Sequence, residues 1–402
     1  MYVQREAQGA LGRLMRQFKV VLVTGARQVG KSTMVQEVLA DRFAYVSLDD
    51  ARLRELARND PALFMKDHVP PVVIDEAQKA PNLFDAVKLV VDARPDKGKI
   101  VLTGSQTYRL MHGVSETLAG RIAVLRMSGL SLRERLGLTG RAPYVPGKNE
   151  GTGTDAARFD VWTTLWRGDM PALLDPDIDW DDFYTHYTAT YVERDVRELI
   201  HVANEERFYR FLVGCAARTG AVLNVSELAR DVGVEVKTCN HWLSILKASG
   251  MVHLLRPYAA NAGKRAIKSP KLYFMDTGLV CHLLGWTSPR VARDGAMSGA
   301  LFETFVVAEI LKSYFNDGRN AQNVFFYRDE RKREIDLVIR DGMTLHPVEI
   351  KKGASPQAAD VRAFSVLEGM ENTQVGAGAV ICQTDRAYSL RENVRAVPLT
   401  AI

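Results

Sequence analysis

The chain has 402 residues, 47% of them hydrophobic and 25% charged, and a formal net charge of +5 at pH 7. A single hydrophobic core rarely grows beyond about 250–300 residues, so this length predicts roughly two or three domains. The composition is typical of a soluble globular protein, and the small positive excess is compatible with nucleic-acid binding without requiring it.

The sequence shows neither a membrane-spanning run nor a recognisable secretory signal. No apolar run reaches the roughly 18 residues that a bilayer-spanning helix needs, and residues 1–6 lack the apolar core of a signal peptide. We therefore expect a cytoplasmic protein with no membrane partner. The cysteines are Cys215, Cys239, Cys281 and Cys382. Because they form no C-x-x-C pair, the sequence argues against a zinc site or a disulfide framework, and we expect reduced, buried thiols.

A glycine-rich loop follows the first strongly apolar run, at residues 20–24. The loop matches G-x-x-x-x-G-K-S and consists of Gly25, Ala26, Arg27, Gln28, Val29, Gly30, Lys31, Ser32 and Thr33. In such loops the backbone N–H groups turn toward a phosphate, and the helix start that follows adds partial positive charge. Lys31 is expected to reach the β- and γ-phosphates and the Ser32 hydroxyl to bind Mg²⁺, with Arg27 as a further cation. The loop therefore predicts ATP binding.

Further apolar runs follow at spacings that leave room for helices. They cover residues 43–48, 71–75, 99–103 and 122–127. Strands that alternate with helical segments are typical of a parallel sheet with crossover helices. The first part of the chain is therefore predicted to be an α/β P-loop domain with a parallel sheet.

Two carboxylates, Asp75 and Glu76, stand at the end of the 71–75 run. In parallel sheets the carboxyl ends of the strands meet the ligand. We interpret Asp75 as the carboxylate associated with Mg²⁺ and Glu76 as the base that orients or activates the attacking water. The alternative, a solvated acidic pair at the start of a loop, is less favoured beside a phosphate loop.

A polar cluster at 103–106 follows the next apolar run and is expected near the γ-phosphate. Gln106 or Ser105 is favoured as the residue that positions the water. Arg121, just before the 122–127 run, is a candidate for stabilising transition-state charge, in cis or across a subunit boundary. The second case would require a homo-oligomer, and a plain surface salt bridge is an equally good interpretation.

The middle of the chain begins with a linker. Residues 137–160 contain glycine, proline, asparagine and threonine and few large apolar residues. From 162 to 200, aromatic and apolar residues recur at helical spacing, which places Tyr187, Tyr191 and Arg194-Asp195 on one long helix. We expect this helical connector to pack on the ATPase domain.

A three-helix pattern occupies residues 205–260. The expected helices cover 208–213, 226–232 and 236–246. Ser226 is a favourable N-cap, Gly233 ends the second helix, and 251–255 would form a wing. The pattern predicts a winged-helix-like module, and such modules serve either DNA binding or protein interaction. The residues expected to face DNA are Lys237, Thr238, Asn240 and His241.

Basic residues then accumulate without an intervening acid. They are Arg256, Lys264, Arg265, Lys268 and Lys271. A basic loop of this kind suits a phosphate backbone, and a solvated surface or a subunit contact are the alternatives.

The last third of the chain contains carboxylates in a pattern typical of phosphodiester nucleases. Glu303 lies in an apolar helical run, Asp336 in a strand, and Glu349 and Lys351 two residues apart on the next strand, where they share a face. Asp336 and Glu349 would hold Mg²⁺, which polarises a phosphate and activates water, and Lys351 would offset the developing charge. A salt-bridged structural trio of Asp336, Glu349 and Lys351 is the alternative.

Several motifs beyond the phosphate loop carry a resemblance to a known family. They are 73–78 (VIDEAQ), 102–106 (LTGSQ), 118–121 (LAGR), 167–171 (RGDMP), 191–195 (YVERD), 271–278 (KLYFMDTG) and 349–351 (EIK). Over nearly its whole length the sequence resembles AAA-family ATPases with a C-terminal domain of unknown function whose core is similar to PD-(D/E)XK nucleases.

The resemblance implies Mg²⁺-dependent ATP hydrolysis by Lys31, Ser32, Asp75 and Glu76. It implies less for the nuclease-like domain, because this fold often binds nucleic acid or partners without cutting. The sequence departs from the nuclease motif at 333–335, which reads Arg-Glu-Ile where the motif has proline.

We therefore predict an ATPase domain at 1–140, a linker and helical connector at 141–204, a winged-helix-like domain at 205–260 and an α/β nuclease-like domain at 261–402. The predicted function is Mg²⁺-dependent ATP hydrolysis coupled to DNA binding, with DNA cleavage as an additional activity. The alternative is a nucleotide-dependent interaction switch with a non-catalytic nuclease-like scaffold. A small-molecule kinase ranks lower, because the sequence shows no evident acceptor lid.

Overall fold

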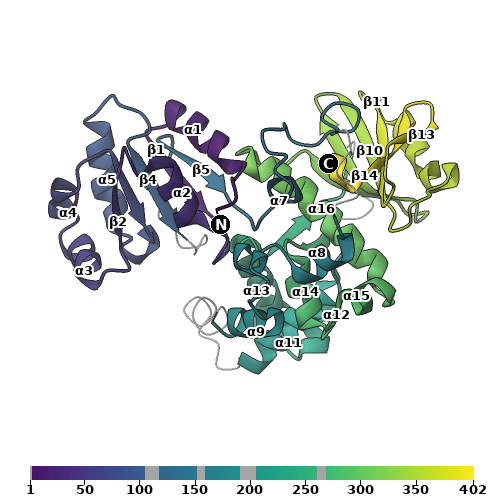
Figure 1. Ribbon diagram of the computed structural model, residues 1–402, viewed down its shortest axis with the longest axis horizontal. Helices are drawn as coiled ribbons and strands as arrows, with labels where there is room; N and C mark the ends of the chain where they lie inside the picture. Colours follow the sequence, from purple (N-terminus) through teal and green to yellow (C-terminus); the bar gives the residue numbers. More distant parts are fainter. Residues whose placement is uncertain (1, 105–116, 152–158, 191–204, 260–268) are drawn as a thin grey trace. The chain divides into compact units, whose positions relative to one another are not determined.

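The computed structural model describes residues 2–104, 117–151, 159–190, 205–259 and 269–402. They form two compact units (Figure 1). The first comprises Met1–Leu130 with the short segments Ala248–Gly250 and Phe315–Arg319, and the second comprises Ser131–Lys247, Met251–Tyr314 and Asn320–Ile402.

The first unit is built on a five-stranded parallel sheet in the order β2-β3-β4-β1-β5. Its strands are β1 (Val20–Thr24), β2 (Ala44–Ser47), β3 (Val72–Asp75), β4 (Ile100–Gly104) and β5 (Ile122–Arg126). These strands coincide with the apolar runs, so the predicted parallel P-loop sheet is confirmed. Because β4 lies between β1 and β3, its carboxyl end is flanked by those of the phosphate-loop strand and the Asp75 strand.

Helices cover both faces of this sheet (Figure 1). They are α1 (Ala7–Gln17), α2 (Lys31–Leu39), α3 (Ala51–Asn59), α4 (Pro61–Asp67) and α5 (Leu83–Asp92), with the 3-10 turn η1 (Ala77–Lys79) after β3. Side-chain caps explain where α3 and α4 begin. The Asp50 carboxylate accepts the backbone N–H of Arg52 at 2.8 Å, and the Asp60 carboxylate accepts that of Leu63 at 2.9 Å. Such caps satisfy N–H groups that have no partner within the helix.

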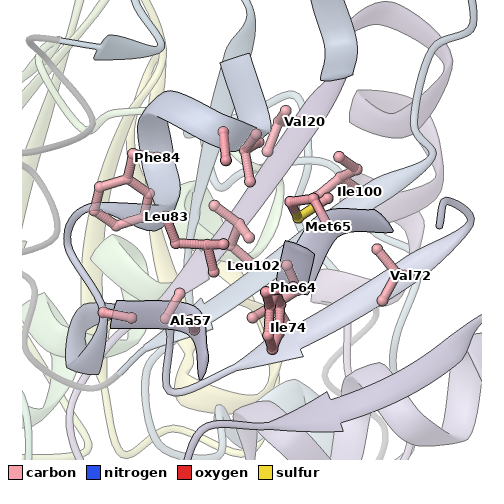
Figure 2. Packing of buried hydrophobic residues seen from close by; sticks show 14 of the residues in the cluster. Val20, Ala57, Phe64, Met65, Val72, Ile74, Leu83, Phe84, Ile100 and Leu102 are labelled. Atoms are coloured by element: carbon pink, nitrogen blue, oxygen red, sulfur yellow. The ribbon is translucent and has the colours of Figure 1, made fainter. Parts of the chain in front are cut away.

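One face of the sheet packs against α3, α4 and α5 in an apolar core (Figure 2). Alternate residues of three neighbouring strands supply the sheet side of this core, and all of them are buried. They are Val20, Leu22, Val72, Ile74, Ile100 and Leu102. The helices contribute Ala57, Phe64, Met65, Leu83, Phe84 and Val87. Burial on both faces explains why the strands read as continuous apolar runs rather than alternating ones.

The second unit begins with helical segments. They are α7 (Leu132–Arg135), α8 (Val161–Arg167), η3 (Pro171–Leu174), α9 (Trp180–Thr190), α11 (Glu205–Ala216), α12 (Val225–Val232), α13 (Val236–Ala248), α14 (Thr277–Leu283), α15 (Pro289–Asp294) and α16 (Ser298–Asn316). The helical segment predicted from 162 is divided, because Gly168 and Pro171 separate α8 from α9. Tyr187 lies on α9, whereas Tyr191, Arg194 and Asp195 lie outside the described residues.

The three helices expected in 205–260 are present as α11, α12 and α13. Gly233 ends α12 in the left-handed conformation, with φ of 77°, as glycine favours. The predicted cap Ser226 lies inside α12, and Asn224 caps the helix instead by accepting the N–H of Glu227 at 3.2 Å. A short antiparallel pair follows, formed by β6 (Val252–Leu255) and β7 (Lys271–Phe274). The assignment of these elements as a winged helix stays a prediction.

A seven-stranded mixed sheet forms the last part of the chain, in the order β13-β14-β12-β10-β9-β8 with β11 beside β10. Its strands are β8 (Val324–Arg328), β9 (Glu334–Asp341), β10 (Thr344–Ile350), β11 (Gln374–Val375), β12 (Gly378–Cys382), β13 (Tyr388–Arg391) and β14 (Val394–Pro398), and η5 (Ala358–Gly369) and η6 (Leu399–Ala401) accompany them. The predicted hairpin joins β9 to β10, and Gly342 takes the left-handed conformation, with φ of 62°.

The four cysteines are buried free thiols, as expected. Among the described residues, none of the helices combines the length and the apolar character that crossing a bilayer requires.

Candidate functional site

Glycine is required at both ends of the phosphate loop. A Cβ on Gly25 would lie 1.9 Å from the carbonyl oxygen of Met127, so the close approach of the chain after β5 leaves no room for a side chain. Gly30 has φ of 87°, a left-handed conformation that glycine adopts without steric cost, and α2 begins at the next residue. The loop therefore turns directly into a helix start, where backbone N–H groups can receive a phosphate.

Lys31 is buried, and its ammonium lies over the loop. The Lys31 Nζ donates to the carbonyl oxygen of Ala26 at 2.6 Å and to that of Gly25 at 3.2 Å. A phosphate would form stronger, charge-assisted hydrogen bonds with this ammonium than the two neutral carbonyls do. This position suits an interaction with a triphosphate that lies on the loop.

Asp75 collects hydroxyl groups from three neighbouring elements. The Asp75 Oδ1 accepts from the Ser32 Oγ at 2.7 Å and from the Thr103 Oγ1, and its Oδ2 accepts from the Ser47 Oγ at 3.4 Å. The structure thus brings Ser32 of the phosphate loop together with the carboxylate predicted to accompany it. Carboxylate and hydroxyl oxygens are ligands that Mg²⁺ takes readily, so these residues fit a magnesium ion bound together with phosphate oxygens.

Glu76 follows Asp75 in the left-handed conformation, with φ of 55° and ψ of 39°. Such a backbone costs on the order of 1 kcal/mol for a residue other than glycine, and it turns the chain sharply at the end of β3. The side-chain amide of Gln78 donates to the Glu76 Oε2, and the Glu76 N–H donates to the Thr103 Oγ1 at 3.4 Å. These contacts hold the glutamate at the same edge of the sheet as Asp75.

The other residues predicted for this site differ in their exposure to solvent, and two of them lie outside the described residues. In the loop, Gln28 has φ of 60° and is exposed, and Val29 is buried. Arg27 is half-buried and Thr33 is exposed at the start of α2. Ser105 and Gln106 lie outside the described residues.

Arg121 lies at the amino-terminal ends of the strands, whereas the phosphate loop lies at their carboxyl ends. It directly precedes β5, whose first residue pairs with Val20, whereas the loop follows the last residue of β1. Its guanidinium contacts the Asp92 carboxylate at 2.5 and 2.8 Å, which is the salt bridge considered in the sequence analysis. A full strand length therefore separates Arg121 from the loop of its own chain, which does not favour the predicted action in cis. Action across a subunit boundary stays a prediction.

Sequence reasoning missed Arg5, whose side chain hydrogen-bonds to the backbone of the phosphate loop. The buried Arg5 guanidinium donates to the carbonyl oxygens of Val29 at 2.6 Å, Ser128 at 2.8 Å and Gly129 at 3.3 Å. It therefore ties the loop to the segment after β5. No local motif marks this residue, because its acceptors are backbone atoms that are distant in sequence.

Sequence reasoning also missed Ser47 and Tyr45 on β2. Ser47 is the last residue of that strand and pairs with Asp75, and its polar character at a strand end was an available signal. Burial and then the charge of Asp75 raise the pKa of Tyr45, whose phenol stays neutral. Both residues belong to the polar surroundings of Asp75.

The predicted nuclease residues converge in the second unit. Asp336 on β9 accepts the backbone N–H of Ile350 at its Oδ2, at 2.8 Å, and Lys351 donates to the Glu349 Oε1 at 2.8 Å. Burial raises the pKa of Asp336 well above its usual range, and the charges of Glu303 and Glu349 raise it further. Burial also raises the pKa of Glu349, against the opposing effect of Lys351.

Lys271 lies at the centre of this cluster, and its assignment to an exposed basic loop is wrong. Its side chain is buried, with the Nζ 3.0 Å from the Glu303 Oε1, 2.5 Å from the Glu334 Oε1 and 3.8 Å from the Asp336 Oδ1. Tyr273 donates to the same Glu303 oxygen at 2.5 Å. Of the salt-bridged trio considered as the alternative, the Glu349–Lys351 pair is present, whereas the printed ion pair of Asp336 is with Lys271, a lysine outside that trio.

The remaining basic residues divide into exposed and undescribed positions. Arg256 is exposed, and Lys264, Arg265 and Lys268 lie outside the described residues. On α13, Lys237, Asn240 and His241 are exposed and Thr238 is half-buried.

Three family models match separate parts of the chain. Residues 17–136 match the AAA domain. Residues 158–290 and 298–402 match two domains of unknown function, DUF8612 and DUF4143. Together with the phosphate loop and the parallel sheet, the first match identifies residues 17–136 as an AAA-type P-loop domain.

Two curated relatives align with almost the whole chain. An uncharacterized protein of Mycobacterium bovis and one of Mycobacterium tuberculosis are each 28% identical to it over 411 aligned positions, which include 99% of this chain and 84% of each relative.

The solved structures that match part of the chain include a Walker-type ATPase of Pyrococcus abyssi, with 14% identity, a TM-score of 0.44 and coverage of 70% of this chain and 96% of that one. The RuvB Holliday junction branch migration motor of Thermotoga maritima has 15% identity, a TM-score of 0.30 and coverage of 63% and 90%.

Proposed function

We propose that the chain binds ATP with Mg²⁺ at the phosphate loop of its AAA domain and hydrolyses it. The observation that carries the proposal is the pair of hydroxyl groups, from Ser32 and Thr103, on the carboxylate of Asp75 beside the loop lysine. Such a group of oxygen ligands, next to an ammonium and a helix start, suits a triphosphate with its metal ion.

Each residue has a distinct role in this proposal. The Lys31 ammonium moves from the loop carbonyls to the β- and γ-phosphates. Ser32 and Asp75 hold Mg²⁺, which neutralises charge on the phosphate oxygens. Glu76 accepts a proton from the attacking water and orients it, and Gln78 keeps the Glu76 carboxylate in position. Ser105 and Gln106 stay predictions for the positioning of that water.

The test is steady-state release of phosphate from Mg²⁺-ATP by the full chain, without an added phosphate acceptor. We expect Glu76→Gln to lower kcat by about 10²-fold or more while ATP still binds, because the amide is isosteric but cannot accept the proton. Lys31→Ala should abolish ATP binding itself. Release that requires an acceptor would support a kinase instead, and equal rates for wild type and Glu76→Gln would refute this role of Glu76.

We further propose that the second unit binds DNA through α13. Lys237, Asn240 and His241 project from the helix into solvent, whereas Trp242, Leu243 and Leu246 are buried on its other face. A helix with one face anchored in a core can present its polar face to a groove. Cleavage is not part of this proposal, because a buried lysine already neutralises the carboxylate cluster.

Salt-dependent binding to duplex DNA distinguishes this proposal from the interaction switch. We expect affinity to fall steeply as salt rises, and Lys237→Ala to reduce the slope of log K against log salt by about 1 if that lysine contacts a phosphate. Lys66→Ala, a substitution in the first unit, is the control. Absence of binding, or binding indifferent to salt, would favour a protein-interaction switch that acts through partners or a second copy of the chain.

A further inference from the structure

The carboxylate cluster of the second unit contains its own cation. Lys271 comes from β7, Glu303 from α16, and Glu334 and Asp336 from β9, so carboxylates from two other elements converge on one ammonium. The side chain of Lys271 is 3% exposed. Its Nζ also lies 5.7 Å from the centre of the Phe326 ring, which closes one side of the cluster.

Burial of an isolated ammonium costs several kcal/mol, and so does burial of carboxylates without a counter-ion. Here the two costs offset each other, because Lys271 faces carboxylates on several sides. Burial by itself lowers the pKa of Lys271, but the charges of Glu303, Asp336 and Glu334 outweigh it and raise the pKa, so the ammonium form is stable. The cluster is electrostatically satisfied by groups that belong to the chain.

With Lys271 in place, the donor atoms of the cluster do not fit a divalent metal ion. The Asp336 Oδ2 is occupied by the N–H of Ile350 and the Glu349 Oε1 by Lys351, and the Glu303 Oε1 receives both Lys271 and the Tyr273 hydroxyl. A magnesium or manganese ion needs several unprotonated oxygens that converge on one point. Across the described ranges of the chain, no group of three or more His, Cys, Asp or Glu side chains is arranged in that way.

We propose that the ammonium of Lys271 is the resident cation of this centre and takes the place that a divalent metal ion would take in a metal-dependent phosphodiesterase. The nuclease-like domain is then a metal-independent scaffold. The positive charge is fixed to β7, so the same contacts that neutralise the cluster also join β7 to α16 and β9. This inference is independent of the ATPase proposal.

Mn²⁺ binding, followed by electron paramagnetic resonance on the full chain without nucleotide, tests the proposal. All variants carry Asp75→Asn, which removes the metal site proposed for the AAA domain. We expect this background protein to bind the same amount of Mn²⁺ with and without Asp336→Asn. We expect Lys271→Met, which keeps the length but removes the charge, to gain about one bound Mn²⁺ per chain. Adding Glu303→Gln should abolish the gain.

Lys352→Met is the matched control. Lys352 is a neighbouring lysine whose Nζ contacts the Ser298 Oγ at 2.7 Å and the carbonyl oxygen of Arg293 at 3.3 Å rather than the cluster, so its loss should create no Mn²⁺ site. The melting temperature gives a second measurement. Mn²⁺ should raise that of Lys271→Met by about 5 °C and leave that of the background protein unchanged.

A stoichiometric Mn²⁺ site in the background protein that Asp336→Asn removes would overturn the proposal. This comparison does not need Lys271→Met to fold, so it decides the question even if that variant is unstable. Folded Lys271→Met that gains no Mn²⁺ would also contradict the proposal, because removal of the resident cation would then leave no cation site.

Discussion

The side-chain amide of Gln78 donates a hydrogen bond to the carboxylate of Glu76, two residues earlier in the chain. Glu76 holds a left-handed backbone conformation at the end of β3, and Gln78 is buried in the 3-10 turn that follows. The turn therefore carries both the glutamate and the group that orients it. Because the amide donates to one oxygen, Oε2, it restricts the rotation of the carboxylate without removing its ability to accept a proton.

Loss of this amide should slow hydrolysis without weakening nucleotide binding. We expect Gln78→Ala to lower kcat for ATP by about tenfold and to change KM by less than about twofold, since the carboxylate is no longer held for the transition state. Steady-state phosphate release over a range of ATP concentrations measures both parameters. Gln17→Ala, at an exposed position at the end of α1, is the control. An unchanged kcat would show that Glu76 needs no positioning by Gln78.

The Thr103 hydroxyl should affect the magnesium requirement. Thr103 is buried on β4 and donates to the same Asp75 oxygen as Ser32. Groups that hydrogen-bond a metal ligand commonly change metal affinity by about 10–100-fold. We expect Thr103→Val to raise the Mg²⁺ concentration for half-maximal hydrolysis by roughly tenfold. Ser47→Ala should have a smaller effect, because its 3.4 Å contact is longer. The reverse order of the two effects would contradict this interpretation.

Arg5 should stabilise the phosphate loop. Arg5→Met would leave the carbonyl oxygens of Val29, Ser128 and Gly129 without this donor, and we expect the first unit to lose about 2–3 kcal/mol of its free energy of unfolding. ATP affinity should fall as well, because the loop loses the hydrogen bond from the Arg5 guanidinium to the Val29 carbonyl oxygen. Urea denaturation and ATP titration measure the two effects. Arg42→Ala is the control, since the Arg42 guanidinium donates to the exposed carbonyl oxygen of Val38 at 3.3 Å. Equal stability of the two variants would exclude a bracing role.

A buried ion-pair network in the second unit should make stability depend on pH. Asp276 accepts the Tyr184 hydroxyl at 2.6 Å, and the Lys312 Nζ lies 2.7 Å from the Asp169 carboxylate. Burial and then the charge of Asp169 raise the pKa of Asp276 from 3.8 to about 7, while Lys312 opposes the rise. Cys281 also faces this carboxylate, and its thiol stays protonated because burial raises its pKa.

A raised pKa means that the folded state binds the proton more tightly than the unfolded state. The contribution of Asp276 to stability is therefore fully present below pH 3.8 and is lost as the pH rises to about 7. We expect Asp276→Asn, which cannot lose a proton, to be more stable than wild type at pH 8 by roughly 1–3 kcal/mol and to show a flatter profile between pH 5 and about 7. Urea denaturation across this range is the measurement. A wild-type profile that rises steadily up to about pH 7 in this unit would show that other groups dominate.

The sequence by itself determined the parallel sheet and the identity of the loop. A continuous apolar run predicts a strand that is buried on both faces. A position where the backbone approaches another segment closely or is left-handed favours glycine, and the glycine is visible in the sequence. Gly25 and Gly30 were recognisable for this reason, Lys31 because it follows Gly30 in the phosphate-loop motif, and Asp75 because it ends an apolar run. In the same way, Gly233 and Gly342 marked the end of a helix and a hairpin.

Only the tertiary structure decided which distant side chains meet. Strand order places β4 between β1 and β3, and with it the Thr103 hydroxyl on Asp75. Because β5 runs parallel to β1, Arg121 lies at the amino-terminal ends of the strands, away from the phosphate loop. Lys271 was assigned to a basic loop because its sequence neighbours are basic, yet the fold surrounds it with carboxylates that come from α16 and β9. Local periodicity encodes the type and the buried face of an element, but electrostatic contacts depend on how elements are paired, and that is set by the packing of the whole unit.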